Sequence, residues 1–326
     1  GAFSDVGSVA GTSAYIVLFE QDGQRFSISA LNDASTVDAL DFASAETRPD
    51  GIVRGLVDHG DLWIFGTKTT EIWANTGDAT FPFSRYSGGA FERGLAWANS
   101  VVSADNGVFW IGDDRVVYRG SAGGQPQRVS TARVDTVLAL LPDTQDVRML
   151  TFDDRGHKMV AIVPTDRPAW VYDLGTGMWH ERSSGIGETP WIATDALMND
   201  GAQVVGGTDG AIHKLGGLTD GGLAIQREAI SSPIDNGGER LRLAKVKLQF
   251  GHGRTDIGRR PVAMVAFSRD GQTWDDEREI PLGLLGEYGW QSWVNGAGRA
   301  YQFSMRVRIT DPIDTPFLGV SYEATA

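Results

Sequence analysis

Residues 52–74 read IVRGLVDHGDLWIFGTKTTEIWA and decide the fold. The stretch holds an apolar segment, an Asp-His-Gly-Asp turn at 58–61, an aromatic segment with a tryptophan, a turn led by Gly66 and a third aromatic segment. Aspartate or asparagine beside glycine supplies the positive φ angles that a tight β-hairpin requires. The stretch therefore predicts three consecutive antiparallel strands.

This unit recurs along the chain. Residues 99–119, NSVVSADNGVFWIGDDRVVYR, repeat it with a turn at 105–107, and residues 147–173 and 191–215 repeat it with drift. Residues 13–29, SAYIVLFEQDGQRFSIS, are a looser first copy. Such recurrence indicates one supersecondary unit used several times.

A short outer strand that contains an arginine follows each later copy, in FPFSRYS, QPQRVS, MWHERSS and AIQREAIS. The marker arginines of the five copies are Arg25, Arg85, Arg128, Arg182 and Arg227. Four-stranded units that recur every 40–50 residues or so are typical of a β-propeller. The sequence therefore predicts an all-β fold with a β-propeller of about five four-stranded blade units over residues 1–230.

One copy contains residue types that are common in active sites. Residues 170–184, WVYDLGTGMWHERSS, hold two tryptophans and a His-Glu-Arg triplet, as the lip of an active site would. In the repeat, however, 170–173 is a third strand and 178–182 an outer strand. Asp173 can accept from backbone amides in the turn between them, and the turn glycines can take left-handed φ. The pattern is similar to a kelch-type blade hairpin, and we favour a structural role.

Two segments interrupt the repeat. Residues 31–51 form a long polar connection between the first and second copies. Residues 130–146 predict one short helix that begins with Ser130 as N-cap and ends at Pro142. Its apolar positions are Val134, Val137, Leu138 and Leu141. Insertions of this kind are natural places for partner contacts.

The pattern changes after Ile230. Residues 241–250 place Leu241, Leu243, Val246, Leu248 and Phe250 at buried positions, and Tyr301, Phe303, Met305, Val307 and Ile309 alternate with polar residues. Period-two alternation with one solvated face indicates antiparallel sheets. The sequence therefore predicts a separate C-terminal antiparallel β-sandwich over residues 231–326, with its first tight turn at 236–238.

Composition excludes several classes of protein. The chain has 326 residues and no cysteine, so it has neither a disulfide framework nor Cys-ligated zinc. It has 29 Lys and Arg against 42 Asp and Glu, a net charge of −13, which disfavours sequence-independent DNA binding by the chain as a whole. No stretch of about 18 apolar residues is present to span a membrane, and the N-terminus has no signal-peptide pattern.

Residues 268–274, SRDGQTW, are close to the Asp-box turn of sialidase-like propellers but one residue short. Asp boxes are structural hairpin devices in which Asp and Ser satisfy turn amides while Trp packs. A sialidase would also need an arginine triad and a tyrosine nucleophile with a carboxylate partner. The arginines here fall at repeat positions instead, so a structural interpretation is favoured.

Metal binding has little support in the spacing of possible ligands. The histidines lie in four different blades and the sandwich, without i, i+2 or i, i+4 pairs; they are His59, His157, His180, His213 and His252. The acidic turn residues, which do not match a calcium loop, are Asp105, Asp113, Asp114, Asp153 and Asp154. We expect no metal site and no cofactor.

No catalytic motif is complete. Residues 66–70, GTKTT, imitate the end of a P-loop, but Asp61 stands where the first glycine belongs and the segment lies between strands. The serine-hydrolase pattern GxSxG is missing. We therefore assign no catalytic, cofactor-binding or metal-binding residue, and predict that the chain is not an enzyme.

Several longer segments resemble a known family. They are ISALNDASTVDALDF and its continuation (28–94), VFWIGDDRVVYR (108–119), QRVST (127–131), WVYDLGTGMWHERSS (170–184) and GEYGWQSWVNGAGRAYQFSMRVRITDPIDTPFLGV (286–320). They are similar to the packaged-DNA stabilisation proteins of short-tailed bacteriophages, which form the tail hub or nozzle. Members of that family usually carry a further segment before the point where this sequence begins, so blade count and ring closure stay open.

The resemblance implies a virion part that is assembled in the bacterial cytoplasm. Several copies would form a ring under the portal and adaptor, close the channel after packaging and conduct DNA during ejection. Implied partners are the portal and adaptor rings, the needle and tailspike, other copies of the chain, and duplex DNA in transient non-specific contact. The resemblance implies no catalytic residues.

Two other functions stay open. The first is a glycan-binding or sialidase-like propeller, which would show arginines and carboxylates that converge in a central pocket. The second is a kelch-type scaffold for cellular partners.

Overall fold

The structure is a computed structural model that describes residues 5–12, 14–45 and 47–325. Ser13 and Glu46, which fall inside the segments 13–29 and 31–51, lie outside the described residues. The chain divides into two compact units. The first runs to Leu215 except for Ser184–Gly187, which belong with Gly216–Ala326 to the second.

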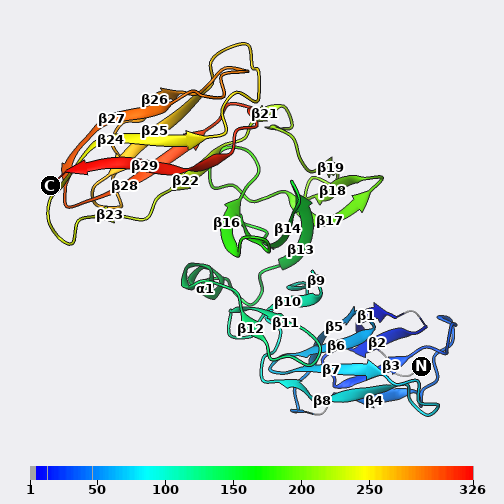
Figure 1. The fold of residues 1–326 in the computed structure, drawn as a ribbon. Coiled ribbons are helices and arrows are strands. Elements are labelled where there is room, and N and C mark those ends of the chain that lie inside the picture. The colour runs from blue at the N-terminus through cyan, green and yellow to red at the C-terminus, as the bar shows by residue number, and fades with distance from the viewer. Residues whose placement is uncertain (1–4, 13, 46, 326) are drawn as a thin grey trace. The chain divides into compact units, whose positions relative to one another are not determined.

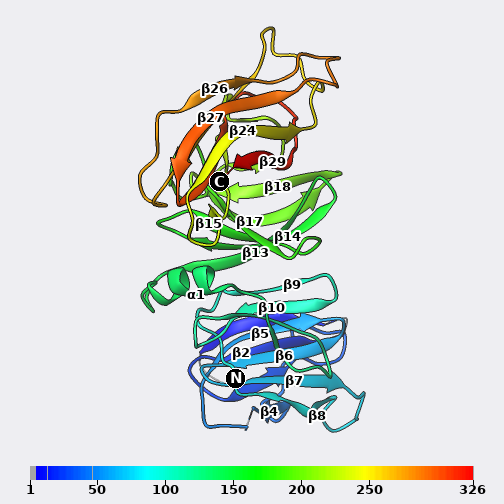
Figure 2. The ribbon, with the colours of Figure 1, turned by 60° about the vertical axis from the view of Figure 1, so that its left-hand side comes forward.

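The described residues of the first unit form five antiparallel sheets, and each is a meander of strands that follow one another in the chain (Figure 1). The first sheet comprises β1 (Val6–Gly11), β2 (Ile16–Glu20), β3 (Arg25–Ile28) and β4 (Phe42–Ser44), and the second β5 (Ile52–Asp58), β6 (Asp61–Gly66), β7 (Thr70–Asn75) and β8 (Phe83–Phe91). The third comprises β9 (Val101–Ala104), β10 (Gly107–Ile111), β11 (Val117–Gly120) and β12 (Gln127–Arg128). The fourth comprises β13 (Val147–Asp154), β14 (His157–Pro164), β15 (Ala169–Asp173) and β16 (Met178–Arg182), and the fifth β17 (Ala193–Asn199), β18 (Ala202–Gly207) and β19 (Ile212–Lys214). Figure 2 shows these sheets in chain order from blue to green.

Apolar side chains of the central strands point alternately to the two neighbouring sheets and pack against both. In β6, Leu62 and Ile64 pack with the first sheet, whereas Trp63 and Phe65 pack with the third. Similar alternation in β10 and β14 gives four apolar cores, one between each pair of sheets that follow each other in the chain. Each sheet is therefore apolar on both faces where it has two neighbours, as propeller blades are. The predicted propeller blades are confirmed.

The predicted hairpin turns are confirmed. His59 and Gly60 have φ of 50° and 90°, and Asp105 and Asn106 have φ of 47° and 56°. Two consecutive residues with positive φ form the type I′ turn that matches the twist of paired strands. The fourth and fifth sheets use Arg155-Gly156 and Asp200-Gly201 in the same way.

Three details of the predicted repeat were wrong. Residues 31–51 are not only a connection, because they contain β4, the outer strand of the first sheet. Arg25, the marker of the first copy, does not match the later markers in position, because it lies in the third strand of its sheet whereas the later markers were assigned to outer strands. Arg227 begins β22 (Arg227–Ile230), which pairs with a strand of the second unit, so the fifth sheet has three described strands.

The predicted helix forms, with a different first turn. The helix α1 spans Ala132–Ala139, and its N-cap is Thr131, whose hydroxyl accepts from Val134 N. Ser130 was wrongly predicted as the cap. Its hydroxyl accepts from Val117 N at 3.0 Å and donates to Asp135, so it ties α1 to the third sheet instead.

The second unit is a sandwich of two antiparallel sheets. One sheet contains β22, β28 (Gln302–Ile309), β25 (Val262–Ser268) and β26 (Arg278–Pro281), which are neighbours in that order. The short strand β23 (Ile234–Asp235) also pairs with β28. The other comprises β27 (Ser292–Ala300), β24 (Leu241–Phe250) and β29 (Phe317–Thr325) in that order. A small hairpin, β20 (Thr219–Asp220) and β21 (Leu223–Ala224), precedes them. The unit starts earlier than the expected boundary at 230/231 because β22 pairs with β28.

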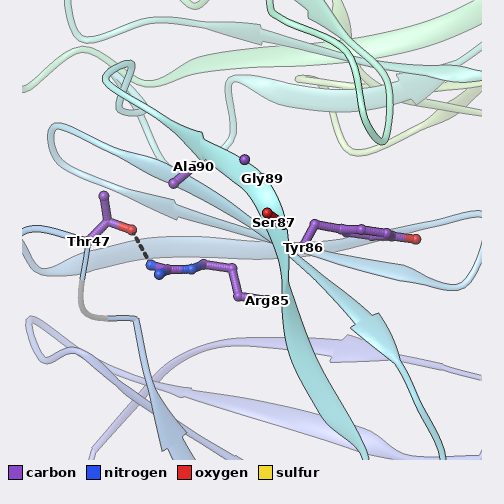
Figure 3. Close-up of a pocket in the computed structure, with 7 residues that line it drawn as sticks. Thr47, Arg85, Tyr86, Ser87, Gly89 and Ala90 are labelled. Atoms are coloured by element: carbon purple, nitrogen blue, oxygen red, sulfur yellow. Dashed lines mark hydrogen bonds between the residues drawn. The ribbon is translucent and has the colours of Figure 1, made fainter.

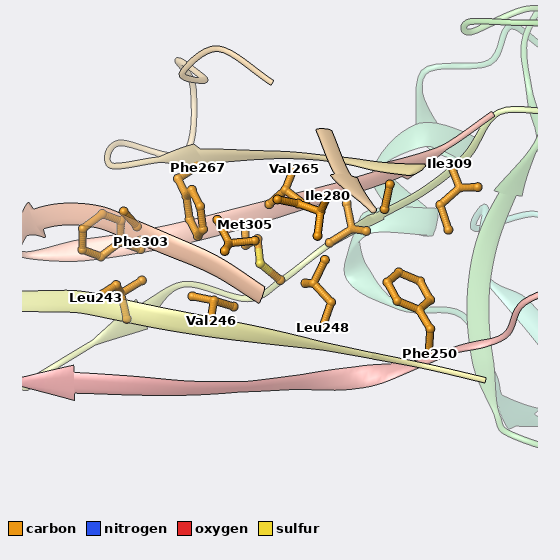
Figure 4. Packing of buried hydrophobic residues seen from close by; sticks show 14 of the residues in the cluster. Leu243, Val246, Leu248, Phe250, Val265, Phe267, Ile280, Phe303, Met305 and Ile309 are labelled. Carbon is orange, nitrogen blue, oxygen red and sulfur yellow. The ribbon is translucent and has the colours of Figure 1, made fainter. Parts of the chain in front are cut away.

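One apolar core fills the sandwich. Figure 4 shows side chains of β24, among them Val246 and Leu248, facing Met305 and Ile280 of the opposite sheet. The predicted buried positions of β24 and β28 are confirmed except for Tyr301, which is 59% exposed because it stands in the turn before β28. The turn at 236–238 forms as predicted, with φ of 61° at Gly237 and 90° at Gly238.

Candidate functional site

A hollow of about 670 Å³ lies in the second sheet. Its lining residues are Thr47 and the run Arg85–Ala90 (Figure 3). In the ladder between β7 and β8, Glu71 is opposite Ala90 and Trp73 is opposite Arg85, so the intervening residues of β8 bulge out of the sheet. Gly88, at φ 77°, permits this bulge.

A buried carboxylate, Glu71, is hydrogen-bonded to two of the residues that line this hollow. Glu71 is 2% exposed and accepts hydrogen bonds from Thr47 N at 2.8 Å, Trp73 Nε1 at 2.9 Å and Arg85 Nη1 at 3.4 Å. Arg85 also donates to Thr47 Oγ1 at 2.6 Å, the bond drawn in Figure 3. Both oxygens of Glu71 are engaged, so this network anchors residue 47 and the end of the first connection to the second sheet.

Two of the described lining residues, Tyr86 and Arg85, are of types that a glycan-cleaving site would use. The hydroxyl of Tyr86 donates to Asp61 Oδ1 at 3.0 Å, and that hydrogen bond and the charge of Asp61 raise the pKa of Tyr86. A raised pKa keeps the phenol protonated and opposes its use as an anionic nucleophile. Arg85 is the single arginine of the lining, whereas the sialidase-like alternative calls for three.

The turn at 268–274 is structural in this chain. Asp270 accepts from Gln272 N at 2.8 Å, Thr273 N at 2.7 Å and Thr273 Oγ1 at 2.6 Å, and Ser268 Oγ accepts from Gly271 N at 2.9 Å. Hydrogen bonds from the Thr273 side chain and then from the two amides hold the pKa of Asp270 far below its usual range. The carboxylate therefore holds the turn in place.

Asp173 has the same role in the fourth sheet. It accepts from Gly175 N and from Thr176 Oγ1, both at 2.8 Å, and its Oδ2 lies 2.9 Å from His157 Nδ1. Gly177 has the expected left-handed φ, at 70°. The stretch 170–184 is thus built as a blade hairpin.

The other residues considered for metal chemistry hold turns and strand pairs. Asp113 accepts from Gly94 N at 2.9 Å and Lys68 Nζ at 3.0 Å, and Asp114 accepts from Tyr118 OH at 2.7 Å. The remaining pairs are Asp105 with Arg119, Asp153 with Lys158, Asp154 with Arg182, His59 with Asp58, and His213 with Asp209. His180 is exposed on β16, and His252 is buried. Within the described ranges no three such residues form a group that could hold a metal ion.

The P-loop imitation is a hairpin turn between β6 and β7. Asp50 Oδ2 accepts from Lys68 N at 2.7 Å and Thr69 N at 2.9 Å, while Thr69 Oγ1 donates to Oδ1 at 2.9 Å. The carboxylate of Asp50 already accepts hydrogen bonds from the backbone amides that would bind a phosphate in a P-loop, so these amides are not available to a phosphate group.

The repeated arginines join neighbouring sheets or strands. Arg182 of β16 lies over the rings of Phe152 and Trp191, 4.9 and 5.3 Å from their centroids, in the core between the fourth and fifth sheets. Burial lowers the pKa of Arg182. Arg128 pairs with Asp135 of α1. These arginines therefore do not converge on one site.

Charge is divided unequally between the two units. Residues 216–326 contain 13 Lys and Arg against 14 Asp and Glu, which leaves 16 against 28 in the rest of the chain. The acidic surplus therefore belongs almost wholly to the blade unit. In the described part of the chain, no helix has the length and apolar character needed to cross a membrane.

These features define a β-propeller protein with a C-terminal β-sandwich. The residues considered above for catalysis or metal binding stabilise turns and contacts between strands in it. A family model described as the β-propeller of bacteriophage P22 Gp10 matches residues 2–220, and one described as the β-sandwich of the same protein matches residues 226–324. The chain belongs to the bacteriophage P22 Gp10 family of packaged-DNA stabilisation proteins. Membership in this family of phage structural proteins implies a non-enzymatic role.

Other comparisons add no functional information. A search of curated proteins finds no match. Two similar solved structures are of the extracellular domain of a protein from B. thetaiotaomicron, described in one as a hybrid two-component system and in the other as a one-component system. Their identities are 11% and 10% and their TM-scores 0.41 and 0.42, with 83% and 91% of this chain covered. This chain spans only 32% and 36% of theirs.

Proposed function

We propose that this protein forms a ring in the phage tail, beneath the portal and adaptor, that closes the channel after packaging and conducts DNA during ejection. The observation that carries the proposal is the match of both units to the Gp10 family of packaged-DNA stabilisation proteins. Its partners in this role are the portal and adaptor rings, the other tail proteins (needle and tailspike) and further copies of the chain.

The charge of the blade unit supports this role. Its 28 acidic against 16 basic residues make a surface that repels phosphate over about a Debye length, roughly 8–10 Å. A cationic wall would release counterions from the duplex and hold it at every contact. An acidic wall lets DNA slide, and we propose that the blade unit supplies part of it.

Reconstitution tests the proposed function directly. DNA-filled capsids that carry portal and adaptor but lack this protein are incubated with the full chain, and retained DNA is measured by nuclease protection. We expect protection only after addition of the chain, together with a new ring below the adaptor in negative-stain images. Equal DNA loss with and without the chain, or the absence of added density, would overturn the proposal.

A glycan-binding function is the second candidate, favoured by Tyr86 and Arg85, which line the hollow in the second sheet, and by Asp61, which accepts a hydrogen bond from Tyr86. It predicts that the chain binds or cleaves members of a glycan panel and that Tyr86→Phe abolishes this activity. If the ring function holds, neither the chain nor the variant will act on the panel, and both will protect packaged DNA equally.

A further inference from the structure

The outer face of the three-stranded sheet of the sandwich is basic. Directly opposite residues of an antiparallel pair share a face, and Lys247 is opposite Trp293 while Arg242 is opposite Arg299. Lys247 stands between the buried Val246 and Leu248, so it faces outward. Arg242 stands between the buried Leu241 and Leu243, and the register shift after Leu243 keeps it on the same outer face. Lys245, two positions before Lys247, lies on the same outer face. One carboxylate, Glu323 of β29, is opposite Lys245. In a unit of almost balanced charge, this face concentrates positive charge.

Trp293 contacts two lysines on this outer face. The ammonium nitrogens of Lys245 and Lys247 lie 4.2 and 5.6 Å from its ring centroid, at cation–π distance. All three side chains are half-buried, and among the described residues neither lysine has a carboxylate within 4 Å. Tryptophan is one of the residues most enriched among the hot spots of protein–protein interfaces. We call these residues, with Arg242 and Arg299, the basic face.

The connection between β3 and β4 has the complementary composition. Leu31 and Leu40 are 63% and 82% exposed, and Asp33, Asp38 and Asp41 lie between or beside them. We call residues 31–41 the acidic connection. It combines exposed apolar side chains with carboxylates, whereas the basic face combines an aromatic ring with ammonium and guanidinium groups.

The acidic connection is ordered by its own hydrogen bonds. Ala30 N donates to Thr36 O at 2.8 Å, Leu40 N to Asp38 Oδ1 at 2.9 Å and Ile28 N to Asp41 O at 3.1 Å. Asp33 accepts from Ser35 N at 2.9 Å and from Thr36 Oγ1 at 2.8 Å. A loop that is already ordered loses little conformational entropy when it binds.

We propose that the basic face of one copy binds the acidic connection of a second copy, with the leucines of the connection against Trp293 and its aspartates beside Lys245 and Lys247. The inference rests on the proposed ring, because it names the contact between successive subunits. The two surfaces differ and belong to the same chain, so the contact is head-to-tail, the type that generates a ring when the rotation closes. Opposite charges on the two surfaces also steer their encounter.

A charge-swap experiment tests this pairing without the portal. One full-length variant carries K245E/K247E, so that both surfaces are acidic, and another carries D38K/D41K, so that both are basic. Association is followed by sedimentation velocity at low salt and by carbodiimide cross-linking of mixed isotope-labelled and unlabelled chains. Circular dichroism checks that each variant is folded.

We expect wild-type chains to form cross-links from Lys245 or Lys247 of one chain to Asp38 or Asp41 of another. Each variant alone should associate at least about a hundredfold more weakly, because like charges meet in the contact. An equimolar mixture of the two variants should recover association, since each surface then faces its opposite. A matched control, R167E with D166K, exchanges an exposed pair elsewhere and should leave association unchanged.

Three results would overturn the proposal. The first is the absence of cross-links between chains at these residues, including at millimolar concentration. The second is cross-linking within one chain only, which isotope mixing reveals. The third is loss of binding to a DNA duplex by K245E/K247E without any change in association of chains, which would assign the basic face to nucleic acid. DNA retention by capsids is a separate readout, so failure of this contact and failure of the ring function are distinguishable.

Discussion

Nδ1 of His157 lies 2.9 Å from Oδ2 of Asp173, which ties the first residue of β14 to the last residue of β15. The same carboxylate accepts from Gly175 N and Thr176 Oγ1 in the following turn. One buried aspartate thus links two hairpins of the fourth sheet, and this relationship explains why a stretch with catalytic residue types is structural.

Replacement of Asp173 by alanine should destabilise the blade unit by about 1–3 kcal/mol, because several hydrogen-bond donors lose their acceptor. Urea unfolding followed by tryptophan fluorescence measures the change. Asp166→Ala, which removes an exposed carboxylate paired with its neighbour Arg167, is the control and should change stability by less than about 0.5 kcal/mol. Equal effects of the two substitutions would contradict this role of Asp173.

The pH dependence of the sandwich should depend on Asp270. Hydrogen bonds from the Thr273 side chain and from backbone amides lower its pKa in the folded state, whereas an aspartate in the unfolded chain has a pKa of about 3.9. Below that pH the unfolded state binds more protons, so the contribution of Asp270 is fully present above about pH 4–5 and is lost as the pH falls toward the folded pKa.

Asp270→Asn should therefore lower the urea midpoint at pH 7 and differ less from wild type at pH 3. The measurement is a set of urea titrations between pH 3 and 7. Asp276→Asn, an exposed neighbour, serves as the control and should give a nearly constant small difference. A gap between wild type and Asp270→Asn that widens on acidification would be the opposite of the expected sign.

Much of this fold follows from local sequence signals. Hairpins with Asp or Asn beside Gly form where positive φ is needed, and the alternation in β6 and β10 places successive side chains in different cores. The strands β1 and β4 escaped prediction because VGSVAG and FAS are short and rich in small residues, so tertiary pairing decides them.

The assignment of β22 required information beyond its own sequence. Its segment resembles an outer blade strand, but Glu228 pairs with Arg308 at 2.9 Å across the ladder with β28, and Arg227 donates to the carbonyls of Asp311 and Ile313. These partners lie about 80 residues away in the sequence. Local pattern alone could not have chosen between the fifth blade and the sandwich.

The hollow in the second sheet was not predicted, although the sequence contains a signal for the bulge that forms it. Ser87-Gly88-Gly89 inside a strand pattern indicates a bulge. The partner of that bulge, Thr47, lies in a connection whose course depends on the buried Glu71. Sequence could therefore have located the bulge, but not the network of hydrogen bonds that Glu71 makes with Thr47 and Arg85.

Arg182 should determine the stability of the contact between the fourth and fifth sheets. Its guanidinium lies over Phe152 and Trp191 in that core, so Arg182→Ala removes both a cation–π contact and packing area. We expect a loss of about 1–3 kcal/mol, with faster amide exchange confined to β17, β18 and β19. Arg182→Lys should retain part of the contact, and unchanged exchange in the fifth sheet of Arg182→Ala would contradict the role.

Gly55 of β5 allows Phe19 of β2 to pack between the first and second sheets. A Cβ added at Gly55 would lie 1.9 Å from Cζ of Phe19, and the fully buried ring has no room to move without displacing its neighbours. Gly55→Ala should therefore overpack this core and cost about 1–3 kcal/mol or more. Gly289→Ala is the matched control, since nothing lies within 4 Å of the added carbon there. Urea unfolding of the double variant with Phe19→Leu identifies the cause. We expect each single variant to be destabilised and Phe19→Leu to relieve part of the Gly55→Ala defect, because the smaller side chain makes room for the added methyl group. Additive effects of the two changes would assign the defect to the strand backbone instead.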